Sequence, residues 1–450
     1  MQKINKLEML DEEDLVYFLH IPKTAGTSLV NILENQFNYN CIYRETIYPE
    51  LFKNFPSNLS DYKLIRGHFG YWITKLLTKK PIILTMLRNP REQIISLFNH
   101  QLRAFKKGDK YSLIKKNHKN ITDVLKDPKL ILNFRNHHIR HLTLDIDVPR
   151  RTNSLREDNH EVMKTLRPKL NSNSQGELLE IAKDRLKNLT FFGLTEKFEE
   201  TLQLLYYTFA WYPVRTVPKL NINPNKSEEN LSSETEDLIQ KYTKEDQELY
   251  EFAEPIFESR YSEMIKALKD QYYEPKHDEI DFNDAIYEML EKYYLEKKRE
   301  KTKYSKNISY SFEKQMIGLG WHSREQINEN VCRWSGPETK SEIYFPLSNE
   351  VDLKIKITIL NQIASDVLKS LELYVNNHNI ELKLKSQKRM WVGGKTCLEA
   401  TISKSFISQG KFTCLTFRVN RTKSPLISNI LLRDTRKIGL LFSKIEMFPL

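Results

Sequence analysis

The fold is decided by the stretch Leu15-Val-Tyr-Phe-Leu-His-Ile-Pro-Lys-Thr-Ala-Gly-Thr-Ser28. Its first five residues form a continuous apolar run, which is typical of a strand buried on both faces. A loop of small and hydroxyl residues follows. An apolar stripe at helical spacing comes next, made of Leu29, Ile32, Leu33 and Phe37. The stretch therefore predicts a buried strand, a short loop and an amphipathic helix.

The same kind of unit recurs further along the chain. Strands are predicted at residues 62–65, 81–87 and 189–194, and a helix at 69–77. Apolar stripes predict two more helices, one at Ile94, Phe98, Leu102 and Phe105 and one at Phe198, Leu202, Leu205 and Phe209. The polar insert 106–185 reads as mainly helical. Strands that alternate with helices indicate a parallel sheet.

The hydrophobic period changes in the last third of the chain. Residues 225–300 carry helical stripes, whereas beyond residue 310 apolar and polar residues alternate. The clearest alternation is Val351, Leu353, Ile355, Ile357 and Ile359, and turns are marked by Asn376-Asn377 and Gly393-Gly394. Several short alternating strands predict a β-sandwich.

These patterns predict an α/β fold with a P-loop-like parallel sheet flanked by helices, plus a C-terminal all-β sandwich domain. The predicted domains are 1–275, a helical and charged linker 276–308, and 309–450.

Composition limits the class of protein. The 450 residues carry a formal net charge of +11, which favours anionic partners without choosing among them. The N-terminal 14 residues have no apolar core typical of a secretory signal, and no run of about 18 apolar residues predicts a transmembrane helix. The four cysteines (Cys41, Cys332, Cys397 and Cys414) form no CxxC pair and read as thiols of a reducing compartment. We therefore expect a cytoplasmic protein.

The loop at residues 20–28 has the composition of an anion site. A loop between a buried strand and a helix directs backbone N–H groups and the positive end of the helix dipole at its ligand. Gly26 permits close backbone approach, Lys23 supplies a point charge, and Thr24, Thr27 and Ser28 supply hydroxyl groups. The loop lacks the GxxxxGK[ST] pattern of ATP and GTP sites, since Lys23 precedes the small residues. The plain alternative is an ordinary turn with a capping threonine.

A second segment, Thr85 to Ser96, repeats the arrangement. Arg88 lies at a strand end, and Asn89 and Pro90 suit the cap and first position of the next helix. Ser96 lies about two turns into that helix. Arg88 and Ser96 could meet one phosphate, through a guanidinium fork and a hydroxyl; a surface arginine and a solvent-facing serine are the alternative.

Three polar residues follow the ends of predicted strands. Lys23, His68 and Arg88 each come after the carboxyl end of a strand. Open α/β sheets bind their ligands along that edge. We therefore expect these three side chains to share one site.

Taken together, these segments resemble the PAPS-dependent sulfotransferases, where PAPS is 3'-phosphoadenosine 5'-phosphosulfate. The match is to the carbohydrate branch that includes heparan sulfate 2-O-sulfotransferase-like proteins (sulfotransferase family 2), over residues about 14–265. It is carried by the loop 20–28, the segment from Arg88 to Ser96, Phe192-Gly-Leu-Thr-Glu196 with Phe198-Glu-Glu200, and Lys219-Leu-Asn-Ile-Asn223.

The resemblance implies a role for each matching residue. The 5'-phosphosulfate would be held by Lys23, Thr24, Ala25, Gly26, Thr27 and Ser28, and Lys23 would also neutralise the leaving oxygen. Arg88 and Ser96 would hold the 3'-phosphate. PAPS would be the co-substrate, a carbohydrate hydroxyl would be the acceptor, and no metal would be required.

The general base is predicted from Arg66-Gly67-His68, where the family carries a His-x-His segment. His68 matches the second histidine, and a neutral imidazole suits a base for a sugar hydroxyl. Arg66 replaces the first histidine and could bind an acceptor carboxylate or sulfate. Arg140 sits where related sequences often have an arginine, so it is a second candidate for substrate contact.

Other features leave alternatives open. His137 and His141 stand one helical turn apart and could chelate a metal, although no acidic ligand accompanies them. The basic run Lys106–Lys119 could receive an anionic polysaccharide or be a solvated face. In the C-terminal module, similar to accessory modules of bacterial glycan-modifying enzymes, sugar rings could stack on Trp321, Trp334 and Trp391, which could equally be buried.

Two other functions compete with sulfotransfer: a non-catalytic glycan-binding protein built around the C-terminal module, and an ATP-dependent phosphotransferase with a degenerate loop. No zinc-finger spacing, RNP motif or basic helix supports nucleic-acid binding.

Overall fold

The computed structural model describes much of the chain. The described residues are 10–11, 13–47, 50–51, 56–106, 113–114, 118, 120–144, 174–215, 231–274, 281–298, 302–388, 395–425, 434 and 436–450. They form two compact units. The α/β unit comprises Met1–Thr27, Cys41–Phe209 and Asn221–Pro275, and the β unit comprises Ser28–Asn40, Ala210–Leu220 and Lys276–Leu450.

The α/β unit is built on a four-stranded parallel sheet. The strands are β1 (Val16–Leu19), β2 (Leu64–Gly67), β3 (Ile82–Leu87) and β4 (Phe191–Leu194). Their order in the sheet is β2-β1-β3-β4, and all neighbours run parallel. Every residue of β1 is buried, as the continuous apolar run predicts. The prediction of a parallel sheet is thus confirmed.

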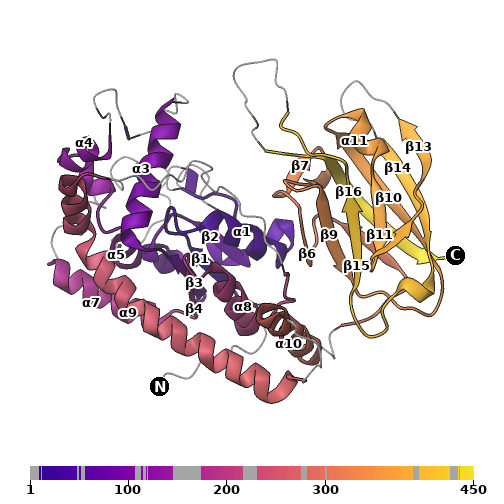
Figure 1. Cartoon of the computed structure of the whole chain (residues 1–450), viewed down its shortest axis with the longest axis horizontal. Helices are drawn as coiled ribbons and strands as arrows, with labels where there is room; N and C mark the ends of the chain where they lie inside the picture. The colour runs from indigo at the N-terminus through magenta and orange to yellow at the C-terminus, as the bar shows by residue number, and fades with distance from the viewer. Residues whose placement is uncertain are drawn as a thin grey trace. The chain divides into compact units, whose positions relative to one another are not determined.

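Helices flank this sheet (Figure 1). They are α3 (Pro90–Lys106), α4 (Ile121–Lys126), α5 (His137–Thr143), α7 (Gln175–Asn188), α8 (Phe198–Phe209) and α9 (Ser233–Tyr272). Local sequence sets several of their starts: α3 begins at Pro90 as predicted, and capping boxes at Asn120 and Ser174 start α4 and α7. Helix α1 (Gly26–Asn35) begins in the α/β unit, and most of its residues group with the β unit.

One predicted helix has a different form. Instead of an α-helix over residues 69–77, the chain forms a short 3-10 helix at Tyr71–Leu76. The hydroxyl of Thr74 donates to the carbonyl of Tyr71 at 2.8 Å, and the N–H of Leu77 donates to the carbonyl of Thr74. Both bonds span three residues, so they favour the tighter turn over an α-helix.

The β unit contains two antiparallel sheets. One has the order β13-β14-β10-β16-β8-β7, with β5 also paired to β16, and the other has the order β12-β11-β15-β9-β6. The strands of the first are β5 (Ile308–Ser311), β7 (Glu325–Ile327), β8 (Asn330–Trp334), β10 (Leu353–Gln362), β13 (Lys383–Lys388), β14 (Lys395–Ile402) and β16 (Leu440–Pro449). Those of the second are β6 (Gly318–Leu319), β9 (Lys340–Phe345), β11 (Glu372–Val375), β12 (His378–Ile380) and β15 (Thr413–Arg418).

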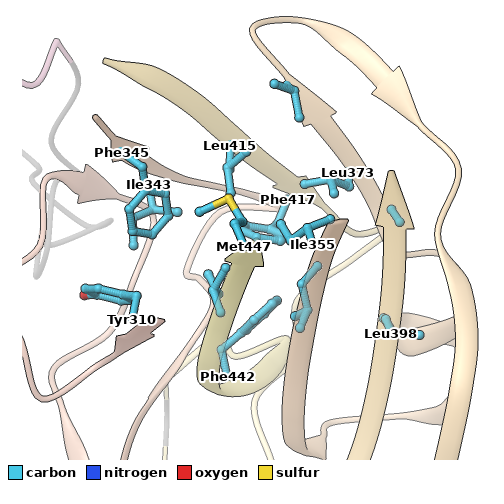
Figure 2. Packing of buried hydrophobic residues seen from close by; sticks show 14 of the residues in the cluster. Tyr310, Ile343, Phe345, Ile355, Leu373, Leu398, Leu415, Phe417, Phe442 and Met447 are labelled. Atoms are coloured by element: carbon cyan, nitrogen blue, oxygen red, sulfur yellow. The ribbon is translucent and has the colours of Figure 1, made fainter. Parts of the chain in front are cut away.

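Both sheets contribute to one hydrophobic core. Ile355 and Phe442 come from the first sheet, and Leu373 and Phe417 from the second (Figure 2). The unit also holds helices α10 (Phe282–Lys297) and α11 (Ser365–Lys369). The turn predicted at Asn376-Asn377 joins β11 to β12, with both residues at positive φ. Among the described residues, no helix is long and apolar enough to cross a membrane.

Candidate functional site

The loop between β1 and α1 has an unusual backbone. Lys23 and Ala25 both adopt left-handed conformations, with φ of 68° and 58°. Left-handed residues within a turn let successive backbone N–H groups converge on one side, which is the form of an anion-binding nest. Thr24 between them is fully buried, and its hydroxyl donates to the carbonyl of Ile21 at 2.9 Å. The hydroxyl hydrogen of Thr24 is therefore used to close the turn.

Gly26, the first residue of α1, lies against the imidazole of His20. A Cβ atom at position 26 would stand 2.0 Å from Nε2 of that ring. The ring centroid of His20 also lies 4.3 Å from that of His68. The absence of a side chain at Gly26 thus makes room for a pair of histidines beside the loop.

The hydrogen bond of His68 defines its tautomer. Its Nδ1 lies 2.8 Å from the carbonyl oxygen of His20. A carbonyl can only accept, so Nδ1 carries the hydrogen and Nε2 keeps a lone pair. Burial lowers the pKa of His68, and Lys23 lowers it further, against the opposing effect of that hydrogen bond. His68 is therefore neutral at pH 7, with one nitrogen able to take a proton.

His20 is held neutral more strongly. Burial lowers the pKa of His20 well below its ordinary value, and the positive charges of Arg66 and Lys23 add to the effect. Burial also lowers the pKa of Lys23, helped by the neighbouring Arg103 and Arg88. The surroundings of the loop are thus electropositive, which favours an anionic ligand.

Arg88 joins the end of β3 to the loop. Its Nη1 donates to the carbonyl of Lys23 at 3.0 Å, and its Nη2 lies 3.8 Å from Glu92. Its Nε is buried and has no hydrogen-bond partner among the described residues. From the first turn of α3, Gln93 donates to the carbonyl of Pro22 at 2.9 Å. The loops after β1 and β3 are thereby bound together at the point where the strand order reverses, which is where open α/β sheets bind ligands.

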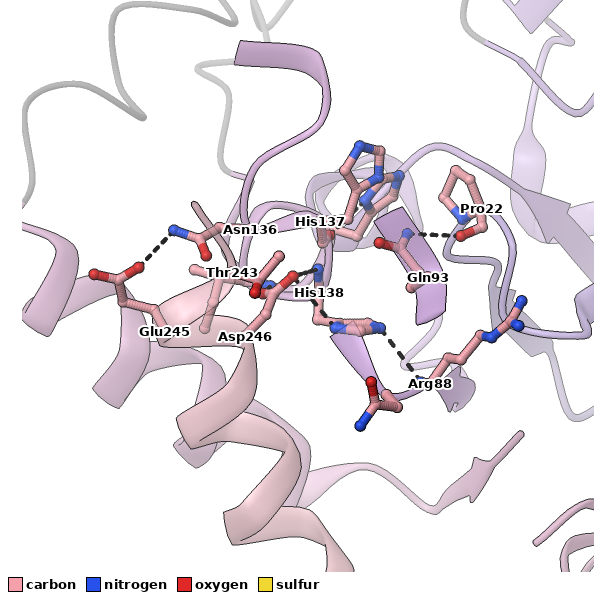
Figure 3. Close-up of polar contacts among 12 residues, drawn as sticks. Pro22, Arg88, Gln93, Asn136, His137, His138, Thr243, Glu245 and Asp246 are labelled. Atoms are coloured by element: carbon pink, nitrogen blue, oxygen red, sulfur yellow. Dashed lines mark hydrogen bonds and ion pairs between the residues drawn. The ribbon is translucent and has the colours of Figure 1, made fainter. Parts of the chain in front are cut away.

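A buried His–Asp pair supports the backbone of Arg88 (Figure 3). Nε2 of His138 accepts from the Arg88 backbone N–H at 3.4 Å, and Nδ1 lies 3.3 Å from the carboxylate of Asp246. The side chains of His138 and Asp246 are each 1 % exposed. The same carboxylate accepts from the backbone N–H groups of His138 and Ile139 at 3.0 and 2.8 Å. Asp246 thus caps the first turn of α5 and orients the imidazole toward Arg88.

The structure brings Lys23, His68 and Arg88 close together, and a ligand site shared by the three stays a prediction. Lys23 and Arg88 are joined by a hydrogen bond, and Lys23 lies close enough to His68 to lower its pKa. The other candidates of the loop and of α3 differ in exposure: Thr27 is exposed, Ser28 is buried and Ser96 is half-buried. Exposure alone assigns no ligand to these three hydroxyls, so their ligand roles stay predictions.

The two candidate substrate arginines contact backbone carbonyls. Arg66 donates to the carbonyl of Arg44 at 3.0 Å, and Arg140 donates to that of Leu132 at 2.8 Å. Arg66 lies close enough to His20 for its positive charge to lower the pKa of that histidine. Substrate contact by either arginine stays a prediction.

Each of the two histidines considered as metal ligands has one ring nitrogen bonded to a backbone carbonyl. Nε2 of His137 hydrogen-bonds the carbonyl of Asn133, and Nδ1 of His141 lies 2.8 Å from the carbonyl of His137. The two rings stack at 5.6 Å. Within the described parts of the chain, no group of three or more His, Cys, Asp or Glu side chains is placed to hold a metal ion.

The tryptophans of the C-terminal module had two possible roles, and several other sequence features lie outside the described residues. Trp321 and Trp334 are buried, at 2 % and 8 % exposure, and Nε1 of Trp321 donates to the carbonyl of Glu342. The buried interpretation of these two residues therefore holds over sugar stacking. Outside the described residues lie Trp391, the turn 393–394, the segment 219–223, and Lys107, Lys110, Lys115, Lys116 and Lys119 of the basic run.

Sequence reasoning missed His20, Gln93, His138 and Asp246. His20 carried a signal, since it directly follows a buried strand and opens the loop. Gln93 stands one turn into a predicted helix, where a glutamine has no special meaning. His138 and Asp246 are 108 residues apart, so no local pattern could pair them.

Comparison with known proteins gives a partial match. No family model matches the chain. The heparan-sulfate 6-O-sulfotransferase 2 of Danio rerio is 38 % identical over 84 residues, which is 19 % of this chain and 18 % of the relative. The chain thus matches less than a fifth of that relative's length. A family 35 carbohydrate binding module from Clostridium thermocellum covers 32 % of this chain and 98 % of its own, at 10 % identity and a TM-score of 0.21, a level too low to inform fold or function. Of these two similarities, only the one to a sulfotransferase bears on function, and it covers 19 % of the chain.

Proposed function

We propose that the protein is a sulfotransferase that moves a sulfuryl group from PAPS to a hydroxyl of a carbohydrate acceptor. The observation that carries the proposal is the loop after β1, whose two left-handed residues are tied to Arg88 at the switch point of the sheet. The partial similarity to a sulfotransferase supports the same function. Residues about 14–265 would form the catalytic part.

The donor would bind across the two loops. The backbone and side chains of the first loop would hold the 5'-phosphosulfate, through Lys23, Thr24, Ala25, Gly26, Thr27 and Ser28. Arg88 and Ser96 would hold the 3'-phosphate. Nε of Arg88 finds no acceptor among the described residues, which supports this assignment because a buried guanidinium nitrogen needs an acceptor. Arg88 would keep its bond to the Lys23 carbonyl and so link the two anion sites.

The reaction would be an in-line displacement at sulfur. Nε2 of His68 would take the proton of the acceptor hydroxyl as that oxygen bonds to sulfur. The bond between sulfur and the 5'-phosphate oxygen would break, and adenosine 3',5'-diphosphate would leave. Lys23 and the loop N–H groups would stabilise the charge on the leaving oxygen, as positioning and electrostatics do in phosphoryl transfer. No metal enters this scheme.

The acceptor and the second unit complete the proposal. Arg66 and Arg140 would contact an acceptor that carries carboxylate or sulfate groups. The module 309–450 would act as an accessory β-sandwich, with glycan binding as its proposed role. The cytoplasmic location stays a prediction from the sequence.

Calorimetric titration with adenosine 3',5'-diphosphate tests the donor site, with AMP and ATP as comparisons. We expect tight binding that requires the 3'-phosphate and is lost in Lys23→Ala and Arg88→Ala. Lys79→Ala is the matched control, because Lys79 is a surface lysine paired with Glu13. Equal affinity for adenosine 3',5'-diphosphate and AMP in the wild type would refute the proposal.

Transfer of labelled sulfuryl from PAPS to a panel of polysaccharides, glycolipids and small glycosides tests the reaction. We expect label in at least one carbohydrate class. Magnesium-dependent binding of ATP would instead favour the phosphotransferase alternative. Carbohydrate binding by a chain that does not bind adenosine 3',5'-diphosphate would favour the glycan-binding alternative.

A further inference from the structure

The β unit contains a completely buried arginine. Arg333 lies on β8, is 0 % exposed, and points away from the small cluster formed by its neighbours Cys332 and Trp334. Its Nε, Nη1 and Nη2 find no hydrogen-bond partner among the described residues. A guanidinium carries five N–H donors, and burying it unpaired is costly. Arg333 therefore needs an acceptor.

A second guanidinium stands across the hairpin. Glu325 pairs with Cys332 in the β7–β8 register, so Arg324, one residue earlier, comes opposite Arg333. Arg324 is 8 % exposed; it donates to the carbonyls of Phe37 and Lys314 at 2.8 and 2.9 Å, and its buried Nε has no partner in the described structure. Like charges directly opposite each other on a sheet repel. Burial, followed by the charge of Arg324, lowers the pKa of Arg333 to about 9.

The remaining neighbours leave this pair with excess positive charge. The hydroxyl of Tyr310 is buried and has no partner within the described residues. Burial raises the pKa of Tyr310 to about 12, and the charges of Arg333 and Arg324, which lie near it, partly oppose the rise. Burial also lowers the pKa of Arg324. Glu34, which is 8 % exposed, partly opposes the lowering at both arginines, and Glu313 does so at Arg324 alone from a more exposed position. In the described part of the chain, one buried carboxylate thus faces two buried guanidinium groups.

We propose that the β unit binds a small monovalent inorganic anion, such as chloride, between Arg333, Arg324 and the hydroxyl of Tyr310. The atoms of these three residues that lack a partner within the described structure are four guanidinium nitrogens and one hydroxyl, and all of them can donate. An anion only accepts hydrogen bonds, whereas a water molecule would bring two further donors. A single negative charge balances two guanidinium groups and one carboxylate. These residues are distinct from those of the loop at residues 20–28.

The bound anion would join separate pieces of the β unit. Arg333 belongs to β8, Tyr310 to β5, and Arg324 already holds the carbonyl of Phe37 just beyond α1. The three residues are buried, at 0 % to 8 % exposure, so the role of the ion would be structural.

The first test measures the melting temperature of the full chain at constant ionic strength while chloride replaces gluconate. A bound ion stabilises the folded state in proportion to the logarithm of its concentration above Kd, so we expect a rise of several degrees. Arg333→Met should abolish this rise. Arg421→Met should keep it, because Arg421 is an exposed arginine of the same unit that pairs with Asp366.

A second measurement keeps the test decisive if Arg333→Met does not fold. Crystals of the wild type soaked in bromide should show an anomalous peak beside the Arg333 guanidinium. The proposal is overturned by a melting temperature independent of the anion together with no such peak. It is also overturned if Arg333→Met retains the chloride effect, or if sulfate stabilises the protein and chloride does not.

Discussion

Replacing Asp246 by asparagine is a sharp test of the polar network behind Arg88. The wild-type carboxylate accepts two backbone N–H groups and contacts Nδ1 of His138, in a place that is 1 % exposed. The amide of Asp246→Asn keeps one acceptor oxygen and directs two N–H donors toward groups that also donate. We therefore expect the variant to destabilise the α/β unit.

The magnitude follows from the hydrogen bonds that the amide cannot make. A hydrogen bond to a charged group contributes about 1.5–3 kcal/mol, and a stranded buried donor costs about 1–3 kcal/mol. One of each predicts a decrease of about 2.5–6 kcal/mol in the free energy of unfolding at pH 7. In a unit of this size each kcal/mol corresponds to roughly 2–4 °C, so the melting temperature should fall by about 5–24 °C.

The pH dependence provides a second readout. Burial raises the pKa of Asp246, but His138 and the two backbone N–H groups outweigh burial and leave the pKa below its ordinary value. A carboxyl with a lowered pKa in the folded state stabilises the protein fully above its unfolded pKa of about 4, and that stabilisation is lost as the pH falls further. The difference between wild type and Asp246→Asn should therefore be largest near pH 7 and shrink below about pH 4.

Calorimetric unfolding of the full-length wild type and of Asp246→Asn, at pH 7 and below about pH 4, measures this difference in the free energy of unfolding. Glu248→Gln is the matched control, because Glu248 is an exposed carboxylate on the same helix. A difference below about 1 kcal/mol at pH 7 would contradict the reasoning, since it is less than one charged hydrogen bond. So would a difference that grows in acid.

Three single substitutions at other positions give further predictions. Gly26→Ala should cost about 1–3 kcal/mol and weaken adenosine 3',5'-diphosphate binding, because its Cβ displaces the His20 ring, while Gly176→Ala, with open space around it, should be neutral or stabilising. His68→Gln should keep calorimetric binding of that nucleotide and lower sulfuryl transfer at least ~100-fold; unchanged transfer would exclude His68 as the base. Asn376→Ala should destabilise the β unit by about 2–4 kcal/mol in calorimetric unfolding, because Asn376 holds a φ of 46° and makes three side-chain hydrogen bonds, and Asn376→Gly should recover part of the loss.

Much of the fold could be predicted because its signals are local. The apolar run of β1 and the cap at the start of α3 are properties of a few adjacent residues, and the structure has both elements. The helix predicted at residues 69–77 became a 3-10 helix because the Thr74 hydroxyl competes for a backbone carbonyl. Such competition depends on side-chain rotamers, which hydrophobic periodicity does not record.

The proximity of Lys23, His68 and Arg88 was predictable from the sequence, whereas the contacts behind them were not. Strand-end positions grouped Lys23, His68 and Arg88, since parallel strands bring their carboxyl ends to one edge. The hydrogen bond that fixes the tautomer of His68, and the His138–Asp246 pair behind Arg88, depend on tertiary contacts between distant residues. Sequence patterns predict candidate site residues more readily than they predict the distant residues that orient them.

The β unit is discontinuous in sequence, and this limits how it can be isolated. Asn31 of α1 donates to the carbonyl of Trp321, and the N–H of Met316 donates to the carbonyl of Asn35. A fragment that begins near residue 309 would lack these partners and would expose the surface they cover. The segment Ser28–Asn40, which begins at the last residue of the loop at residues 20–28, is thus a structural part of the β unit. Truncation at the apparent boundary would cut through a folded body, so the module's properties are better measured by point variants in the intact chain.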